Sequence, residues 1–134
     1  MLKLPLAWLA TAVVFGAMDA VWLSTMSSRL YKPVIGELMS GKVEMVPAVL
    51  FYLIYISGLV FFAVWPGVKS GDLGKAALAA AIFGLVAYGT YDLTNQATLK
   101  VWAWKLTLAD MAWGAVASGI AASAGVWAAR LLSR

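Results

Sequence analysis

The sequence contains no cysteine and no histidine, and only 12% of its 134 residues are charged. The absence of cysteine excludes disulfides and thiol nucleophiles, and the absence of both residues removes the usual ligands of zinc and haem. A Ser-His-Asp catalytic triad is excluded as well. We therefore expect no cofactor and no resident metal, so any proton chemistry has to rest on carboxyl, hydroxyl and amide groups.

Hydrophobic residues make up 63% of the chain and gather in four long runs. A membrane-spanning helix needs about 20 mostly apolar residues, and residues 4–23, 46–65, 76–95 and 106–132 meet this requirement. The first run is too long for the apolar core of a signal peptide and is followed by no cleavage site. The sequence therefore predicts an all-α fold: an integral membrane four-helix bundle that forms a single transmembrane domain over residues 1–134.

The formal net charge of +4 comes from basic residues that are scattered over the predicted loops and chain ends. Contact with lipid headgroups explains this distribution better than a nucleic-acid surface does. We expect membrane lipids as partners, and no nucleic acid.

Several local patterns predict how the spans are joined and packed. Residues 66–71, with Pro66, Gly67 and Gly71, predict the turn before the third span, which Asp72 is expected to begin. Residues 31–39 predict a short interfacial helix after the first span. Small residues at helical spacing predict close packing between helices, or between protomers of a homo-oligomer or larger membrane complex: Ala77, Ala81, Gly84, Gly114, Ser118 and Gly125.

The first and third spans share a weak internal similarity. Aligning GAMDAVWLST (residues 16–25) with GTYDLTNQAT (residues 89–98) matches Gly, Asp and Thr. Such a repeat would make the protein two helical hairpins related by a pseudo-twofold axis along the membrane normal.

Three acidic residues lie inside the predicted spans, at one depth. At 1.5 Å per residue, Asp19 lies roughly 22 Å and Asp92 roughly 24 Å from the side that holds the N-terminus. Asp110 lies roughly 6 Å from the opposite side by the same count. Because a lipid-facing carboxylate is costly, we expect the three to point inward and to share protons, amide donors or a cation.

Helical spacing extends each acid into a face that also carries aromatic and amide side chains. These faces together predict a polar and aromatic pocket near one membrane face. Its candidate binding residues are Asp19, Trp22, Tyr52, Tyr55, Tyr88, Asp92, Asn95, Gln96, Asp110 and Trp113, and the three aspartates are also the candidates for catalysis.

The sequence is also compatible with structural roles for the same acids. Asp110 could cap the fourth span, because a carboxylate at a helix start accepts backbone N–H bonds. Asp92 could form a salt bridge to Lys100. A positive group among the acids could come from Lys100, Lys105 or Arg29, and a buried polar cluster could also serve only to fix helix register.

The segments GAMDAVWL, SSRLYKPVIGELM and YDLTNQATLKVW resemble a family of small bacterial membrane proteins catalogued as domain of unknown function 2177. The resemblance covers essentially the whole chain, and YDLTNQATLKVW is its most specific segment. It implies a four-helix protein of the bacterial inner membrane with no assigned activity. It also implies that Asp19, Asp92, Asn95 and Asp110 are the family's polar signature.

Three functions are compatible with these observations. The first is a module that binds or transports a small cationic or amphiphilic, lipid-like ligand, held by carboxylates and aromatic faces. The second is an intramembrane enzyme that modifies a lipid with paired aspartates as general acid and base, or with a divalent metal held by the three aspartates. The third is an accessory or structural subunit of a membrane complex.

Overall fold

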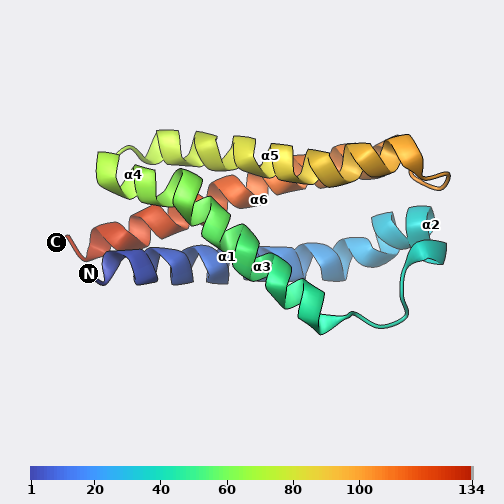
Figure 1. Cartoon of the computed structure of the whole chain (residues 1–134), viewed down its shortest axis with the longest axis horizontal. Helices are drawn as coiled ribbons and strands as arrows, with labels where there is room; N and C mark the ends of the chain where they lie inside the picture. The colour runs from blue at the N-terminus through green and yellow to red at the C-terminus, as the bar shows by residue number, and fades with distance from the viewer. Residues whose placement is uncertain (134) are drawn as a thin grey trace.

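The computed structural model describes residues 1–133, which form four long helical segments joined by short connections (Figure 1). All four are long and apolar enough to cross a membrane. The protein is thus an all-α, multi-pass integral membrane protein, as the composition predicts. Many of its large hydrophobic side chains are exposed, as expected for a surface that faces lipid.

The first segment is longer than predicted and does not stop at the end of its apolar run. Helix α1 (Lys3–Met26) continues through a π-helical turn, η1 (Ser27–Tyr31), into α2 (Lys32–Ile35) and the 3₁₀ turn η2 (Gly36–Leu38). The expected short helix over residues 31–39 is therefore joined directly to the first span. A π turn holds an extra residue and so changes the direction of the side chains after it, and here it carries Tyr31.

The second segment consists of α3 (Met45–Leu59), a π turn, η3 (Val60–Val64), and α4 (Trp65–Ser70). The predicted turn at residues 66–71 is wrong for most of its length, because Pro66 and Gly67 lie within α4. Proline is tolerated in the first turn of a helix, and Gly67 packs so closely that a Cβ there would lie 2.5 Å from that of Ala76.

The chain actually turns at Gly71 and Asp72. Gly71 has a left-handed backbone, with φ of 73°, and Asp72 caps the next helix by accepting a hydrogen bond of 3.0 Å from the Lys75 amide. Arg130 also donates a hydrogen bond of 2.5 Å to the Gly71 carbonyl. The third span therefore begins at Asp72, as predicted, and the last helix fastens the turn before it.

The third and fourth segments are α5 (Leu73–Thr98) and α6 (Trp104–Leu131), which pack along each other more extensively than any other pair. Helix α1 packs against α6 and only slightly against α3. The two predicted hairpins, spans one and two and spans three and four, are therefore packed differently. Helices α5 and α6 lie together, whereas α3 crosses the bundle diagonally (Figure 1).

Small residues allow this close approach, as predicted. A Cβ on Gly84 would collide with the backbone carbonyl of Gly114 and lie 2.6 Å from the hydroxyl of Ser118, and one on Gly125 would collide with Thr11 of α1. Because lipid supplies no hydrophobic force between helices, association depends on such contacts. Helix α6 is thus the central helix of the bundle, with α5 and α1 on its faces.

Candidate functional site

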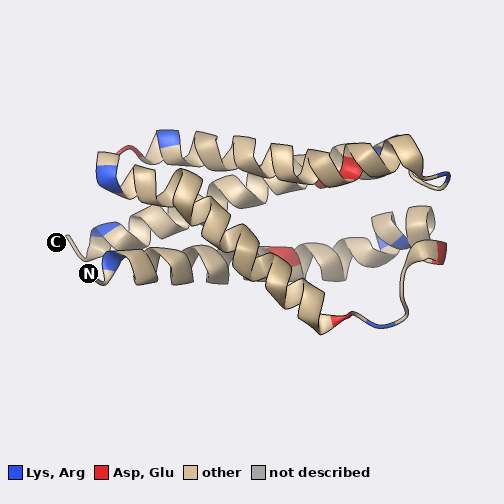
Figure 2. Cartoon of the chain, viewed as in Figure 1, with Lys and Arg blue, Asp and Glu red and all other residues tan. Residues whose placement is uncertain are grey.

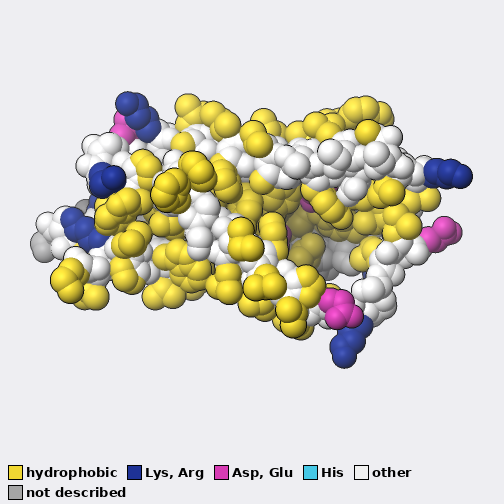
Figure 3. All heavy atoms as spheres, in the orientation of Figure 1, with side chains coloured by type: hydrophobic (Ala, Val, Ile, Leu, Met, Phe, Trp, Pro, Cys, Tyr) yellow, Lys and Arg dark blue, Asp and Glu magenta, His cyan; other side chains and the backbone are white. Residues whose placement is uncertain are grey.

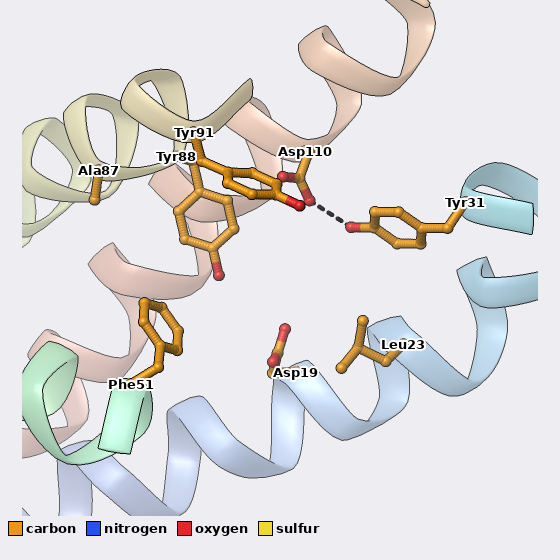
Figure 4. A pocket seen from close by; sticks show the side chains of 8 residues that line it. All are labelled: Asp19, Leu23, Tyr31, Phe51, Ala87, Tyr88, Tyr91 and Asp110. Carbon is orange, nitrogen blue, oxygen red and sulfur yellow. Dashed lines mark hydrogen bonds between the residues drawn. The ribbon is translucent and has the colours of Figure 1, made fainter. Parts of the chain in front are cut away.

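A cavity of about 350 Å³ lies between α1, the start of α3, α5 and α6, and its walls are aromatic and acidic. Figure 4 shows Asp19 and Asp110 pointing into this space, together with the hydroxyl of Tyr88. The cavity is lined by Asp19, Leu23, Tyr31, Phe51, Ala87, Tyr88, Tyr91 and Asp110. Among residues 1–133, no basic side chain belongs to this lining.

The cavity is open on the side of the bundle. Figure 3 shows the surface hollowed between α3 and α5, with acidic atoms at the bottom of the hollow. The helices run across this view, so the hollow faces the direction from which lipid would contact the protein. Phe51 and Leu23 of the lining are both partly exposed, so the cavity joins acidic groups to an apolar surface.

Asp19 is held by two donors from different helices. The hydroxyl of Tyr52 on α3 donates to one carboxylate oxygen, and the indole N–H of Trp113 on α6 donates to the other at 3.3 Å. Asp19 is only 7% exposed. Donors on both oxygens fix the orientation of this buried carboxyl, so Asp19 is held in place at the cavity.

Asp110 accepts a hydrogen bond from the hydroxyl of Tyr31, which itself accepts a bond of 2.8 Å from the indole N–H of Trp22. The Tyr31–Asp110 bond spans 79 positions of sequence and closes the end of the cavity nearest α2 (Figure 4). The π turn η1 brings Tyr31 to this position. The predicted capping role of Asp110 is wrong, because α6 begins six residues earlier, after Ala103.

Trp22 and Trp113 connect the two acids. Their rings stack with centroids 4.6 Å apart and planes at 7°. Each indole belongs to a different hydrogen-bond chain, one ending at Asp110 and the other at Asp19. The rings thus form a rigid apolar support behind both carboxyls.

Asp92 does not line the cavity. It is fully buried, and no donor within residues 1–133 reaches either of its carboxylate oxygens. Asp92 faces α6 at the level of Asp110, because the Thr107 hydroxyl lies 3.5 Å from the Asp92 carbonyl and a Cβ on Gly89 would lie 2.9 Å from Met111. The predicted salt bridge between Asp92 and Lys100 is therefore wrong; Lys100 is exposed in the connection between α5 and α6.

The predicted amide residues are placed beside the site and not in it. Gln96 forms part of a clasp between α5 and α6, in which the Trp102 indole donates to Thr107 at 2.9 Å and Thr107 donates to Gln96 at 2.8 Å. Asn95 is half-buried on the last turn of α5. The contact of Gln96 with Thr107 fixes the end of α5 next to Asp92, whose carbonyl lies 3.5 Å from the Thr107 hydroxyl.

Two predicted tyrosines form the inner wall. The hydroxyl of Tyr55 is hydrogen-bonded to Ser118 at 2.7 Å, so it is buried and turned away from the cavity. Its ring packs against that of Tyr88, which does line the cavity. Gly114 makes room for Tyr88, because a Cβ there would collide with the ring.

The suggested positive partners do not enter the site. Arg29, Lys100 and Lys105 are exposed, and Figure 2 shows basic residues at helix ends and loops, whereas acidic residues also lie within helices. Within the described chain no group of three acidic side chains is arranged to hold a metal ion. A metal bound by Asp19, Asp92 and Asp110 together is therefore not supported.

Sequence reasoning missed Leu23, Tyr31, Phe51, Ala87 and Tyr91 among the lining residues. Tyr91 could have been found, because it lies one helical turn after Tyr88 on the same side of α5. Tyr31 carried no such signal, since it follows the first apolar run and reaches the site only through η1.

Fold and site together define a multi-pass integral membrane protein with an acidic, aromatic cavity inside the bundle. Residues 4–127 match the family model described as "Predicted membrane protein (DUF2177)", and the chain belongs to that family. No curated protein and no solved structure matches the chain significantly.

Proposed function

We propose that the cavity binds a small amphiphilic ligand whose positively charged headgroup lies between Asp19 and Asp110. The observation that carries this proposal is the placement of two carboxyls in one aromatic cavity whose lining has no basic side chain. A cation there would meet opposite charge and the faces of tyrosine rings, both of which attract it.

The shape of the cavity supports an amphiphile over a fully hydrated ion. Its volume of about 350 Å³ lies near the lower end of small-molecule sites. Leu23 and Phe51 line the cavity and are 45% and 47% exposed, so the lining includes apolar side chains that also reach the surface. A hydrocarbon chain can lie along these side chains, in contact with lipid, while the headgroup lies at the acids.

The proposal is tested by thermal unfolding of the protein in lipid nanodiscs with a short-chain alkyltrimethylammonium ion. The same chain ending in a tert-butyl group is the uncharged control. We expect stabilisation by the cation alone. Asp19→Asn and Asp110→Asn should each weaken binding by roughly 30-fold or more, because removing one partner of a buried charge pair costs about 2–5 kcal/mol.

Glu37→Gln provides the matched control, since this carboxyl is exposed and lies in η2, outside the cavity. Equal stabilisation by the charged and uncharged compounds, or undiminished binding by both Asn variants, would contradict the proposal. Uptake of the same cation into proteoliposomes separates transport from binding alone.

The enzyme hypothesis is less well supported, because Asp92 and the two predicted amides, Asn95 and Gln96, do not line the cavity and would not touch a bound substrate. We further propose the bacterial inner membrane as the location. The supports are the resemblance to small bacterial membrane proteins and the helical form of all four spans. Fractionation of bacterial membranes tests this assignment.

A further inference from the structure

Asp92 is a buried carboxyl whose hydrogen-bonding capacity is unused. It is 0% exposed, and neither oxygen has a donor among residues 1–133. An ionised carboxylate accepts several hydrogen bonds in water, and burying it without replacements is very unfavourable. The structure therefore requires another explanation for an aspartate at this position.

The groups around Asp92 do not provide the hydrogen bonds or positive charge that would stabilise an ionised carboxylate. On α6 the facing acid is Asp110, because the contacts of Thr107 with the Asp92 carbonyl and of Gly89 with Met111 put Asp92 level with it. The hydroxyl of Thr107 is used by Gln96 at 2.8 Å, and that of Tyr31 on η1 is used by Asp110.

On α5 itself, the neighbouring Tyr91 is 59% exposed. The third acid, Asp19 on α1, lies at the cavity and adds only negative charge. Among the described residues, the basic side chains suggested as partners, Arg29, Lys100 and Lys105, are all exposed.

We propose that Asp92 and Asp110 form a proton-binding site, in which one proton is held between the two carboxyl groups behind the ligand cavity. The proton converts one acceptor of the pair into a donor, so that the carboxyls bond to each other and the pair carries a single negative charge. Tyr31 stabilises that charge by donating to Asp110.

A proton fits this site better than a metal cation does. Hard cations take about six or more oxygen ligands, and the carboxyls of the pair are the only acidic ligands here, with no third acid completing a cluster in the described chain. A proton needs only two oxygens. The site is also closed to the cavity on the Asp92 side, which leaves no room for a hydrated ion.

The pair has a consequence for ligand binding, which rests on the function proposed above. A cation that enters beside Asp110 adds one positive charge, and loss of the shared proton removes one. The cation is then exchanged for the proton without a change in the net charge of the site. Asp110 is the carboxyl common to both events, since it lines the cavity and lies on α6 at the level of Asp92.

Infrared spectroscopy of the ligand-free protein in nanodiscs at neutral pH tests the pair directly. We expect a C=O stretching band of a protonated carboxyl, shifted when aspartate is labelled with ¹³C at the side-chain carbon. Asp92→Asn should abolish the band, and Glu37→Gln should leave it unchanged. Where Asp92→Asn does not fold, the labelled wild-type protein still shows whether an aspartate carboxyl is protonated. Absence of the band, or its persistence in a folded Asp92→Asn protein, would overturn the proton site.

Calorimetry with the alkyltrimethylammonium ion in two buffers of different ionisation enthalpy tests whether the bound cation replaces the shared proton. We expect release of about one proton per bound cation in the wild type and none in Asp92→Asn. Binding without proton release would overturn the exchange and leave the pair intact. Absence of binding would instead overturn the proposed function, while the infrared band still decides whether the proton is there.

Discussion

Trp22 and Trp113 stack face to face with centroids 4.6 Å apart, and each indole N–H leads to a different buried aspartate. Trp113 donates to Asp19 directly, whereas Trp22 reaches Asp110 through the hydroxyl of Tyr31. The stacked pair therefore joins the two sides of the cavity, although its members lie on helices far apart in sequence. Fixing two carboxyls by separate donor chains keeps them in place when the cavity is empty.

Trp113→Phe should destabilise the protein by about 1.5–3 kcal/mol, because Asp19 loses a hydrogen bond to a charged group. The ring and most of its stacking are retained. Thermal unfolding in nanodiscs measures the loss. Trp127→Phe is the matched control, since that side chain is 58% exposed on the same helix and should change the midpoint little. Equal effects of the two substitutions would contradict the role assigned to Trp113.

Tyr31→Phe should also lower stability, by about 2 kcal/mol or more, because one hydroxyl serves Trp22 and Asp110 together. Tyr91→Phe makes the same chemical change at another lining residue that is 59% exposed. Its cost should be below about 1 kcal/mol, in the range of substitutions away from buried networks. Thermal unfolding of the two variants makes the comparison. A larger drop of the midpoint in Tyr31→Phe than in Tyr91→Phe supports the closure of the cavity by Tyr31 of η1.

Gly84→Ala should destabilise the bundle by about 1–3 kcal/mol through overpacking, because the new methyl group meets the Gly114 backbone. Gly16→Ala is the opposite case, since a Cβ there has nothing within 4 Å. It should stabilise α1 by about 0.5–1 kcal/mol through helix propensity. Denaturation of both variants under identical lipid conditions gives the sign of each change, and the same sign for both would contradict the packing assigned to α5 and α6.

Ala87→Phe should block the proposed ligand site without touching an acid. Ala87 is half-buried in the cavity wall on α5, so a larger side chain there occupies the space that a headgroup would need. We expect stabilisation by the alkyltrimethylammonium ion to fall at least about tenfold in apparent affinity, which corresponds to about 1.4 kcal/mol.

Leu78→Phe is the control for Ala87→Phe, because it lies on the same helix, is 62% exposed and is absent from the cavity lining. Ligand titration of both variants by thermal shift makes the comparison. Full affinity in a folded Ala87→Phe protein would place the ligand elsewhere.

The number of spans and the identity of the acids inside them could be predicted from the sequence, because apolar length and helical rise alone decide them. The placement of Asp19 and Asp110 at one site was also predictable by counting depth. The different environment of Asp92 was not, because depth says nothing about rotation around a helix axis. Tyr31 was unpredictable for a related reason, since a π turn leaves no strong sequence signal.

The sequence by itself determined an all-α membrane bundle with three acids on three of its helices. Only the tertiary structure decided which carboxyl opens to the cavity, which is buried behind it, and which donors hold each one. The physical reason lies in the solvent. Lipid is as apolar as the inside of the bundle, so the pattern of hydrophobic residues does not reveal the inward face of a helix. Close contacts such as Gly84 on Gly114 and Gly125 on Thr11 set those rotations instead.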